Sequence, residues 1–158
     1  MEFNSWFAGL IESDGSIIVP ETRRDNKGRL RYPAIKIVFH VDDLPLAKRL
    51  IEILGGGVIE YSKGKSCVLW FRSAEDLQKI IGRINGHIRT PKIEALHRLL
   101  LWFNNSENPT NYSLLGPDTS PKCRTVGWLV LLMEMLIFIL TSKKIQKVNV
   151  SRSTDGFI

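Results

Sequence analysis

The chain has 158 residues, of which 44% are apolar and 24% charged, an ordinary composition for a globular protein that excludes a largely disordered chain. Its formal net charge of +6 and pI near 9.5 suit a polyanionic partner, although many soluble proteins share this balance. Cys67 and Cys123 have no motif spacing, so we expect free thiols in a reducing compartment. No signal peptide is visible, and the N-terminus lacks the pattern of a transit peptide.

The first predicted element is a helix in the stretch WFAGLIESDGS (6–16), with a buried stripe made of Trp6, Phe7, Leu10 and Ile11. Gly9 and Ser13 lie four residues apart on one face, and a glycine inside a helix costs about 1 kcal/mol relative to alanine. Gly15 stands where a helix usually ends in a left-handed turn. Asp14 is therefore at the negative end of the helix dipole, where a carboxylate needs a cation beside it.

A first hairpin is expected next, with strands at 16–20 and 34–41 and a charged loop at 21–33 that turns at DNKG. The alternation in the second strand predicts a buried face made of Ile35, Ile37, Phe39 and Val41. The opposite face carries Lys36, Val38 and His40.

The later elements are a helix at 42–57, a hairpin at 58–71 and helices at 73–84 and 90–103. The first of these helices has an Asp cap and Pro45 in its first turn, the hairpin turns at Lys63-Gly64, and Pro91 opens the last helix. This order predicts an α+β domain in which one antiparallel sheet has helices on one face. The other face is then bare and carries Lys36 and His40, with Glu60 and Ser62 from the second hairpin.

The C-terminal third reads differently, since residues 105–125 have the composition of a linker and residues 126–140 are apolar all round. The apolar run is shorter than the roughly 20 residues that a membrane span needs, and Glu134 interrupts it. We therefore expect a buried helix and tail over 126–158 rather than a membrane anchor.

The stretch FAGLIESDG (7–15) resembles the signature of the LAGLIDADG homing endonucleases, with six of its nine positions identical to the name motif. The segment 35–59 is similar to the second strand, following helix and glycine-rich turn of that family. The segment RTPKIEALHRLL (89–100) resembles the part that supplies its basic active-site residue. The resemblance covers residues 1–104 as an endonuclease domain and implies an αββαββα fold with a saddle-shaped antiparallel sheet.

In this family the signature helices of two copies, or of two halves, pair at a two-fold axis, which requires small residues at the contact. The resemblance implies an interface made of Ala8, Gly9, Glu12 and Ser13, with Glu12 in a structural role. It also implies that Asp14, with the Ser13 carbonyl beside it, holds Mg²⁺ or another divalent cation over the scissile phosphates. On this interpretation, the metal supplies the cation that the helix end lacks.

Three further residues have two interpretations each. Lys92 matches the basic site, where it would stabilise phosphate charge, and is otherwise a solvated surface lysine. Asp43 lies near a position that orients water in some members, or it caps the helix at 44–54. For His40 we favour a phosphate contact over a role as a general acid or base.

A basic stretch marks the expected DNA-binding surface, because residues 22–36 hold six cationic side chains against one acidic residue, Asp25. A saddle-shaped sheet face above such a loop favours phosphate contacts and insertion of a β-ribbon into the major groove, the alternative being a solvated loop. The candidates are Arg23, Arg24, Lys27, Arg29, Arg31, Lys36, His40, Glu60, Ser62, Lys63 and Lys65. The last strand, SCVLWF, is apolar on both faces, so its DNA-facing side is not assigned.

The family contains homodimers with one motif and monomers with two. The segment 114–135 resembles a linker and the start of a second motif, with Glu134 in the place of Glu12. Bulky and apolar residues replace the small residues and the acid there, namely Val130, Leu131, Met135 and Leu136. The chain is either a two-motif protein truncated early in its second half or a true dimer with an apolar tail.

The resulting expectation is a site-specific double-stranded DNA endonuclease that hydrolyses phosphodiesters with a divalent metal and acts as a homodimer. The alternatives are a maturase-like partner of intron RNA, a nucleic-acid-binding protein without cleavage, and an inactive half-protein. By resemblance, the origin is an intron of a mitochondrion or chloroplast.

Overall fold

The computed structural model describes residues 2–62 and 64–120, which form four helices, a short 3-10 helix and four strands. In chain order these are α1 (Glu2–Asp14), β1 (Gly15–Ile18), β2 (Ala34–His40), η1 (Val41–Asp43), α2 (Leu44–Leu54), β3 (Val58–Tyr61), β4 (Ser66–Phe71), α3 (Ala74–Ile84) and α4 (Ile93–Asn104). The order confirms the predicted α+β class and the αββαββα arrangement, followed by the last helix that was predicted at 90–103.

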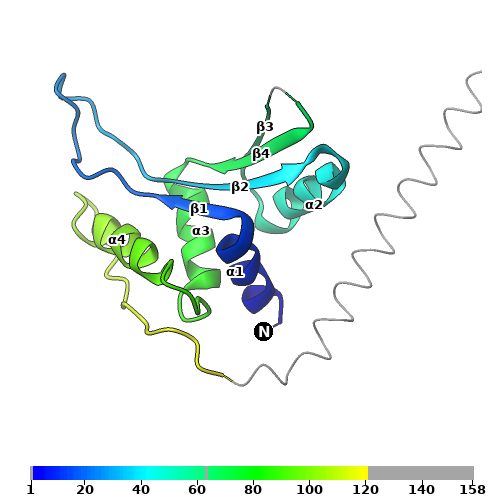
Figure 1. Ribbon diagram of the computed structural model, residues 1–158. Helices are drawn as coiled ribbons and strands as arrows, with labels where there is room; N and C mark the ends of the chain where they lie inside the picture. Colours follow the sequence, from blue (N-terminus) through cyan, green and yellow to red (C-terminus); the bar gives the residue numbers. More distant parts are fainter. Residues whose placement is uncertain (1, 63, 121–158) are drawn as a thin grey trace, which may run out of the picture. The chain divides into compact units, whose positions relative to one another are not determined.

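The strands form one antiparallel sheet in the order β1-β2-β4-β3. Figure 1 shows α1, α3 and α4 on the same side of this sheet. The alternating residues of the two central strands that face the helices are buried, namely Ile35, Ile37 and Phe39 of β2 and Cys67, Leu69 and Phe71 of β4. The predicted buried face of β2 is correct except for Val41, which lies in η1 and is exposed. The face opposite the helices is open, as predicted.

Several element ends follow from local capping. Ser73 accepts a hydrogen bond from the Asp76 amide at 3.0 Å, and Gly55 ends α2 in the left-handed conformation with a φ of 67°. Asp43 precedes α2, but its side chain makes no capping hydrogen bond, so the predicted cap is wrong. Instead, His40 accepts from the Asp42 amide and starts η1. Helix α4 begins at Ile93, two residues after Pro91.

Helix α1 buries a slightly different stripe from the predicted one. Phe7, Ala8 and Ile11 are fully buried, whereas Leu10 is half-buried. Gly15 is not in a left-handed turn but is the first residue of β1. A Cβ atom there would lie 2.7 Å from both the Cα and the carbonyl oxygen of Ile11. The glycine is required because the strand leaves the helix in close contact with its last turn.

Residues 105–120 contain no helix or strand, as predicted for a linker, but hydrogen bonds fix them to the domain. Asn104 exchanges two bonds with the backbone of Tyr112, and the His97 ring contacts the Leu115 carbonyl at 2.8 Å. The compact unit therefore extends to Ser120 instead of ending at 104. The predicted apolar helix at 126–140 and the partial second motif lie outside the described residues. Within the described ones, no helix has the length and hydropathy to cross a membrane.

Candidate functional site

Asp14 is the last residue of α1, and its side chain is exposed where the helix passes into β1. The Ser13 hydroxyl lies 3.0 Å from Oδ2 of Asp14 and 3.1 Å from the Leu10 carbonyl, so it can donate to either oxygen. The carboxylate thus stands at the junction of the signature helix and the sheet, open to solvent.

The side chain of Lys92 contacts the backbone at the same end of α1. Its Nζ donates to the carbonyls of Ile11, Glu12 and Gly15 at 3.0, 2.6 and 2.7 Å. An ammonium has three donors, and all three are used here: two on the Ile11 and Glu12 carbonyls that the helix end leaves without partners, and one on the carbonyl of Gly15 at the start of β1. The cation that the helix end requires is therefore Lys92 of the same chain, which corrects the interpretation that the terminus lacks one. The catalytic role of Lys92 stays a prediction.

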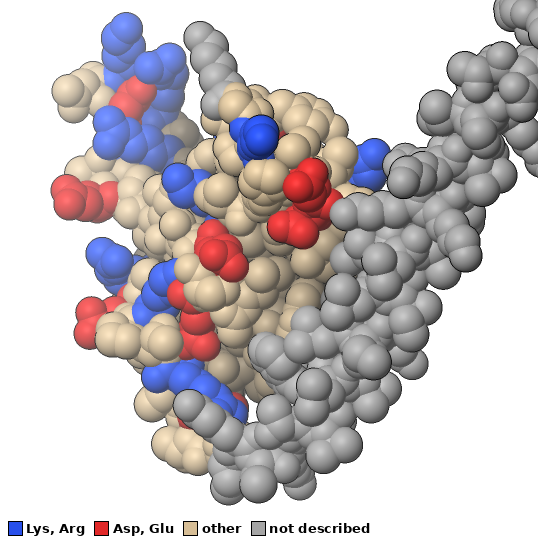
Figure 2. All heavy atoms as spheres, turned by 45° about the vertical axis from the view of Figure 1, so that its right-hand side comes forward, with Lys and Arg blue, Asp and Glu red and all other residues tan. Residues whose placement is uncertain are grey.

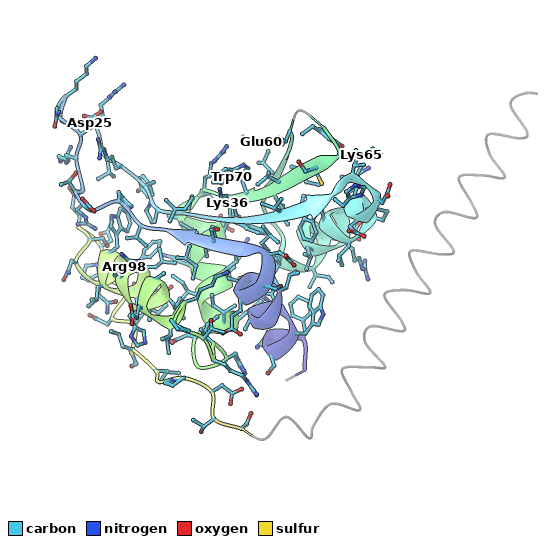
Figure 3. The ribbon with its side chains drawn as sticks, in the orientation of Figure 1. Asp25, Lys36, Glu60, Lys65, Trp70 and Arg98 are labelled. Atoms are coloured by element: carbon cyan, nitrogen blue, oxygen red, sulfur yellow. The ribbon has the colours of Figure 1, made fainter. Side chains whose placement is uncertain are left out.

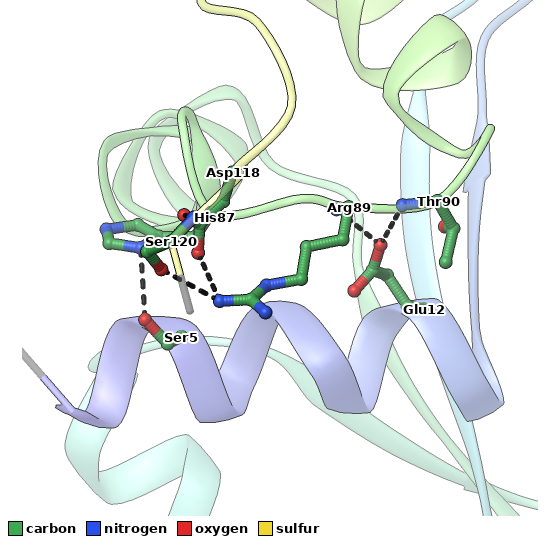
Figure 4. A network of polar contacts seen from close by, with 7 residues as sticks. All are labelled: Ser5, Glu12, His87, Arg89, Thr90, Asp118 and Ser120. Carbon is green, nitrogen blue, oxygen red and sulfur yellow. Dashed lines mark hydrogen bonds and ion pairs between the residues drawn. The ribbon is translucent and has the colours of Figure 1, made fainter. Parts of the chain in front are cut away.

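Glu12 has a structural position within its own chain (Figure 4). One of its carboxylate oxygens accepts from the backbone amides of Arg89 and Thr90 at 2.7 and 2.6 Å. The Arg89 guanidinium in turn donates to Asp118 at 2.7 Å and to Ser120 at 2.9 Å. The bonds from Ser120 and Arg89 lower the pKa of Asp118 to about 2. This network connects the signature helix to the segment before α4 and to residues 118–120.

The small residues of α1 divide into two groups. Ala8 is fully buried inside its own chain and offers no surface to a second copy, contrary to its predicted place at an interface. Gly9 is half-buried and Ser13 is exposed, so the face they share is accessible. These two residues remain candidates for a close contact between two helices.

The described residues of one chain do not form a complete metal site. No group of three or more His, Cys, Asp or Glu side chains in residues 2–62 and 64–120 is arranged to hold an ion. Asp43 is exposed in η1 and lies beyond β2, whereas Asp14 lies before β1. The hard oxygens of Asp14 suit a divalent cation such as Mg²⁺.

The open face of the sheet carries several of the predicted DNA contacts. Lys36 of β2 is paired with Trp70 of β4, and Glu60 of β3 is opposite Val68. Figure 3 shows Lys36, Glu60 and Trp70 on the side of the sheet away from α1. His40 is exposed next to Asp42, whose carboxylate is 3.2 Å from its Nδ1 atom. The buried residues of β4 also settle which of its sides is open, namely that of Ser66, Val68 and Trp70.

The sequence analysis did not identify Arg72, which directly follows β4 and belongs to no recognised motif. Its Nη1 and Nη2 donate to the two oxygens of Glu60 at 2.5 and 3.2 Å, and its guanidinium carbon lies 4.1 Å from the centre of the Trp70 ring. The hydrogen bonds and charge of Arg72 lower the pKa of Glu60. The two-residue spacing from Trp70 was the signal that could have placed Arg72 on this face.

The basic loop at 19–33 extends beyond the sheet, and Figure 2 shows Lys and Arg gathered there around an acidic side chain. Gly28 closes the expected turn by donating to the Asp25 carbonyl at 2.9 Å. The exposed cationic residues of the loop are Arg24, Lys27, Arg29 and Arg31. Arg24 also donates to the Gly28 carbonyl, and Arg29 is paired with Asp25 at 2.8 Å.

Arg23 differs from the other loop cations because its guanidinium is occupied within the chain. It donates to the carbonyls of Trp102 and Asn105 at 2.8 and 2.5 Å and lies 4.7 Å from the Trp102 ring centre. It fixes the loop to the end of α4, and its predicted phosphate contact stays a prediction. In the second hairpin Ser62 and Lys65 are exposed, and Lys63 lies outside the described residues.

Comparison with known proteins gives the family. A sequence model of the LAGLIDADG endonucleases matches residues 7–102, which is more than half of the chain. The chain belongs to the LAGLIDADG endonuclease family. The intron-encoded DNA endonuclease aI3 of Saccharomyces cerevisiae is 36% identical over 106 residues, which are 66% of this chain and 25% of that protein. The intron-encoded RNA maturase bI4 of the same yeast is 27% identical over 92 residues, 58% of this chain and 13% of that protein.

Solved structures of a meganuclease and of a homing endonuclease share the fold. The meganuclease I-SmaMI, in a crystal structure bound to uncleaveable DNA, is 27% identical with a TM-score of 0.53, over 65% of this chain and 38% of that one. The homing endonuclease I-TnaI is 21% identical with a TM-score of 0.50, over 66% of this chain and 89% of that one. The chain spans a quarter or less of the length of the curated relatives that it matches. The matched part covers nearly all of the I-TnaI structure and less than half of the I-SmaMI structure.

Proposed function

We propose that this LAGLIDADG protein is a site-specific endonuclease of double-stranded DNA. The observation that carries the proposal is the exposed Asp14 carboxylate at the end of the signature helix, in a domain that also has an open sheet face and a basic loop beyond β1. The similarity to the DNA endonuclease aI3 and to the DNA-bound meganuclease I-SmaMI supports DNA as the substrate.

We assign different roles in DNA binding and cleavage to residues at different positions in the fold. Lys27, Arg31 and Lys36 supply positive charge for phosphates, and Asp14 holds a divalent cation such as Mg²⁺. When bound, such a cation neutralises phosphate charge and activates water for hydrolysis. Lys92 keeps the end of α1 in place through its three backbone bonds and thereby fixes the position of Asp14. Asp43 stays a candidate for positioning water, and the Ser13 carbonyl a candidate ligand.

The proposal includes a homodimer, in which a second copy supplies a second signature helix. One described chain offers one carboxylate at the helix end, whereas cutting two strands requires two such sites. The accessible face of Gly9 and Ser13 allows two signature helices to approach closely, which brings two Asp14 residues together. We expect Gly9→Leu to convert the dimer to a monomer in sedimentation equilibrium, with Gly82→Leu on an exposed turn of α3 as control. An unchanged dimer would place the contact elsewhere.

An RNA maturase is the second candidate, favoured by the similarity to bI4. The same basic loop would serve intron RNA, and Asp14 would then be dispensable. An organellar intron as the origin remains part of the proposal, since both curated relatives are intron-encoded proteins.

The decisive experiment is incubation with a randomised duplex library and Mg²⁺, followed by sequencing of the cut ends. We expect the wild-type protein to cut a defined motif and Asp14→Asn to bind that motif without cutting it. Glu94→Gln, at an exposed acid of α4, is the matched control and should cut normally. Cutting by Asp14→Asn at the wild-type rate would refute the role of Asp14. Binding of intron RNA together with no cutting of any duplex would favour the maturase.

A further inference from the structure

Arg72, Glu60 and Trp70 form an ordered cluster on the open face of the sheet. Arg72 makes two hydrogen bonds to the Glu60 carboxylate, and its guanidinium is stacked over the Trp70 ring at 4.1 Å. Lys36 approaches the same ring at 5.6 Å. Two cations and one carboxylate therefore surround a single indole.

This arrangement is not explained by the stability of the fold. The side chains of Arg72 and Glu60 are 51% and 48% exposed, and exposed ion pairs contribute little to stability. None of the three residues belongs to the core below the sheet, where Cys67, Leu69 and Phe71 are buried. The cluster instead holds a planar, charged group in one orientation on an accessible surface.

The guanidinium keeps donors for a ligand. It has five N–H groups, and the two bonds to Glu60 use two of them. The stack on Trp70 and the hydrogen bonds to Glu60 of β3 hold the guanidinium plane in one orientation. Less conformational entropy of the Arg72 side chain is therefore lost when a ligand binds. A planar ligand with two adjacent acceptors fits the remaining donors, and guanine presents such a pair, N7 and O6, in the major groove.

The neighbouring side chains suit a base-pair edge as well. Ile18, Val38 and Val58 are exposed large apolar residues on the same face, at 42%, 44% and 60%. Apolar side chains contact the methyl group of thymine in the major groove. The deep, narrow major groove of RNA does not admit such a surface, so duplex DNA is favoured over duplex RNA.

We propose that Arg72 reads a guanine in the major groove of the target duplex, while Glu60 and Trp70 are positioning residues that orient its guanidinium. The inference rests on the proposed DNA-binding function and adds a base-reading residue to it. Because Lys carries the same charge without the planar fork, Arg72→Lys separates recognition of the base from attraction to phosphate.

The test uses binding without Mg²⁺, so that cleavage does not enter. The full-length protein selects its motif from a randomised duplex library, and affinities are then measured for every single base substitution in that motif. For the wild type, acting as the proposed dimer, we expect one G·C pair in each half-site whose replacement weakens binding about 5- to 150-fold. Arg72→Lys should bind the motif but lose most of the preference at that pair, with its salt dependence unchanged. Arg98→Lys, at an exposed arginine of α4 shown in Figure 3, is the matched control and should keep the preference.

Glu60→Gln gives a second, milder variant that keeps the shape of the side chain. It should reduce the same preference in part, and at no other position, because it loosens the orientation of Arg72. A full preference in Arg72→Lys would overturn the inference while leaving DNA binding intact, as would equal weakening of all duplexes. Failure of the wild-type protein to enrich any motif would overturn the proposed function and this inference together.

Discussion

Replacing Lys92 by methionine tests the finding that its ammonium caps α1. The substitution keeps an unbranched apolar stem and removes three hydrogen bonds to the carbonyls of Ile11, Glu12 and Gly15. A hydrogen bond to a charged group contributes about 1.5–3 kcal/mol, and a cation at a helix end about 0.3–1 kcal/mol. The three bonds share one ammonium, and Lys92 is only half-buried, so that water can reach the freed carbonyls in part.

We therefore expect Lys92→Met to lower the free energy of unfolding by about 3 kcal/mol, rather than by the sum of three separate bonds. For a unit of this size, that corresponds to a fall in Tm of about 10–15 °C. The assay is thermal unfolding followed by circular dichroism, with Lys48→Met at an exposed lysine of α2 as control. If Lys92→Met melts within 1–2 °C of the control and yet cuts no DNA, the capping argument is refuted and Lys92 acts in catalysis alone.

Three further outcomes are expected. Gly15→Ala should destabilise the protein by about 1–3 kcal/mol in urea unfolding, because the added Cβ atom would lie 2.7 Å from the Ile11 backbone. The control Gly82→Ala should not destabilise it, because a Cβ atom at Gly82 has open space around it. The pKa of Asp118 is lowered from 3.8 to about 2, so its contribution to stability is full above pH 4 and is lost as the pH falls through 2. Asp118→Asn should therefore make the free energy of unfolding depend less on pH between 4 and 2. The same pH dependence in the variant and the wild type would contradict this. The double variant Lys27→Ala, Arg31→Ala should reduce the slope of log affinity for DNA against log salt by about 1.8 per subunit, and a wild-type slope would mean that the loop does not reach the DNA backbone. Arg23→Ala should mainly lower Tm, because Arg23 holds the loop to the end of α4.

Local patterns were sufficient for the elements and their order. The alternation in β2 and the apolar periods of α2 and α3 depend on neighbouring residues, so they are legible in the chain itself. The same holds for the turn at Asp25–Gly28. The signature stretch also placed Asp14 correctly at the end of the first helix, because motif and helix end coincide.

The roles of the basic residues could not be predicted, because their partners are distant in sequence. Lys92 bonds to carbonyls 77 to 81 residues away, and Arg23 to carbonyls 79 and 82 residues away. Each of these side chains satisfies the end of a helix that only the folded chain brings beside it. A composition count adds Arg23 to the DNA-binding charge, whereas the structure uses it to hold the loop.

The sequence by itself therefore determined the class of fold, the family and the position of the acid, since these depend on short spacings. Tertiary structure decided which face of β4 is open, since both of its faces are apolar and only packing on the helices buries one of them. It also decided that Gly15 is needed for a close approach rather than for a left-handed turn. Finally, it joined Glu60 to Arg72 across two strands, because the pairing of β3 with β4 places residues 12 apart in the chain within hydrogen-bond distance.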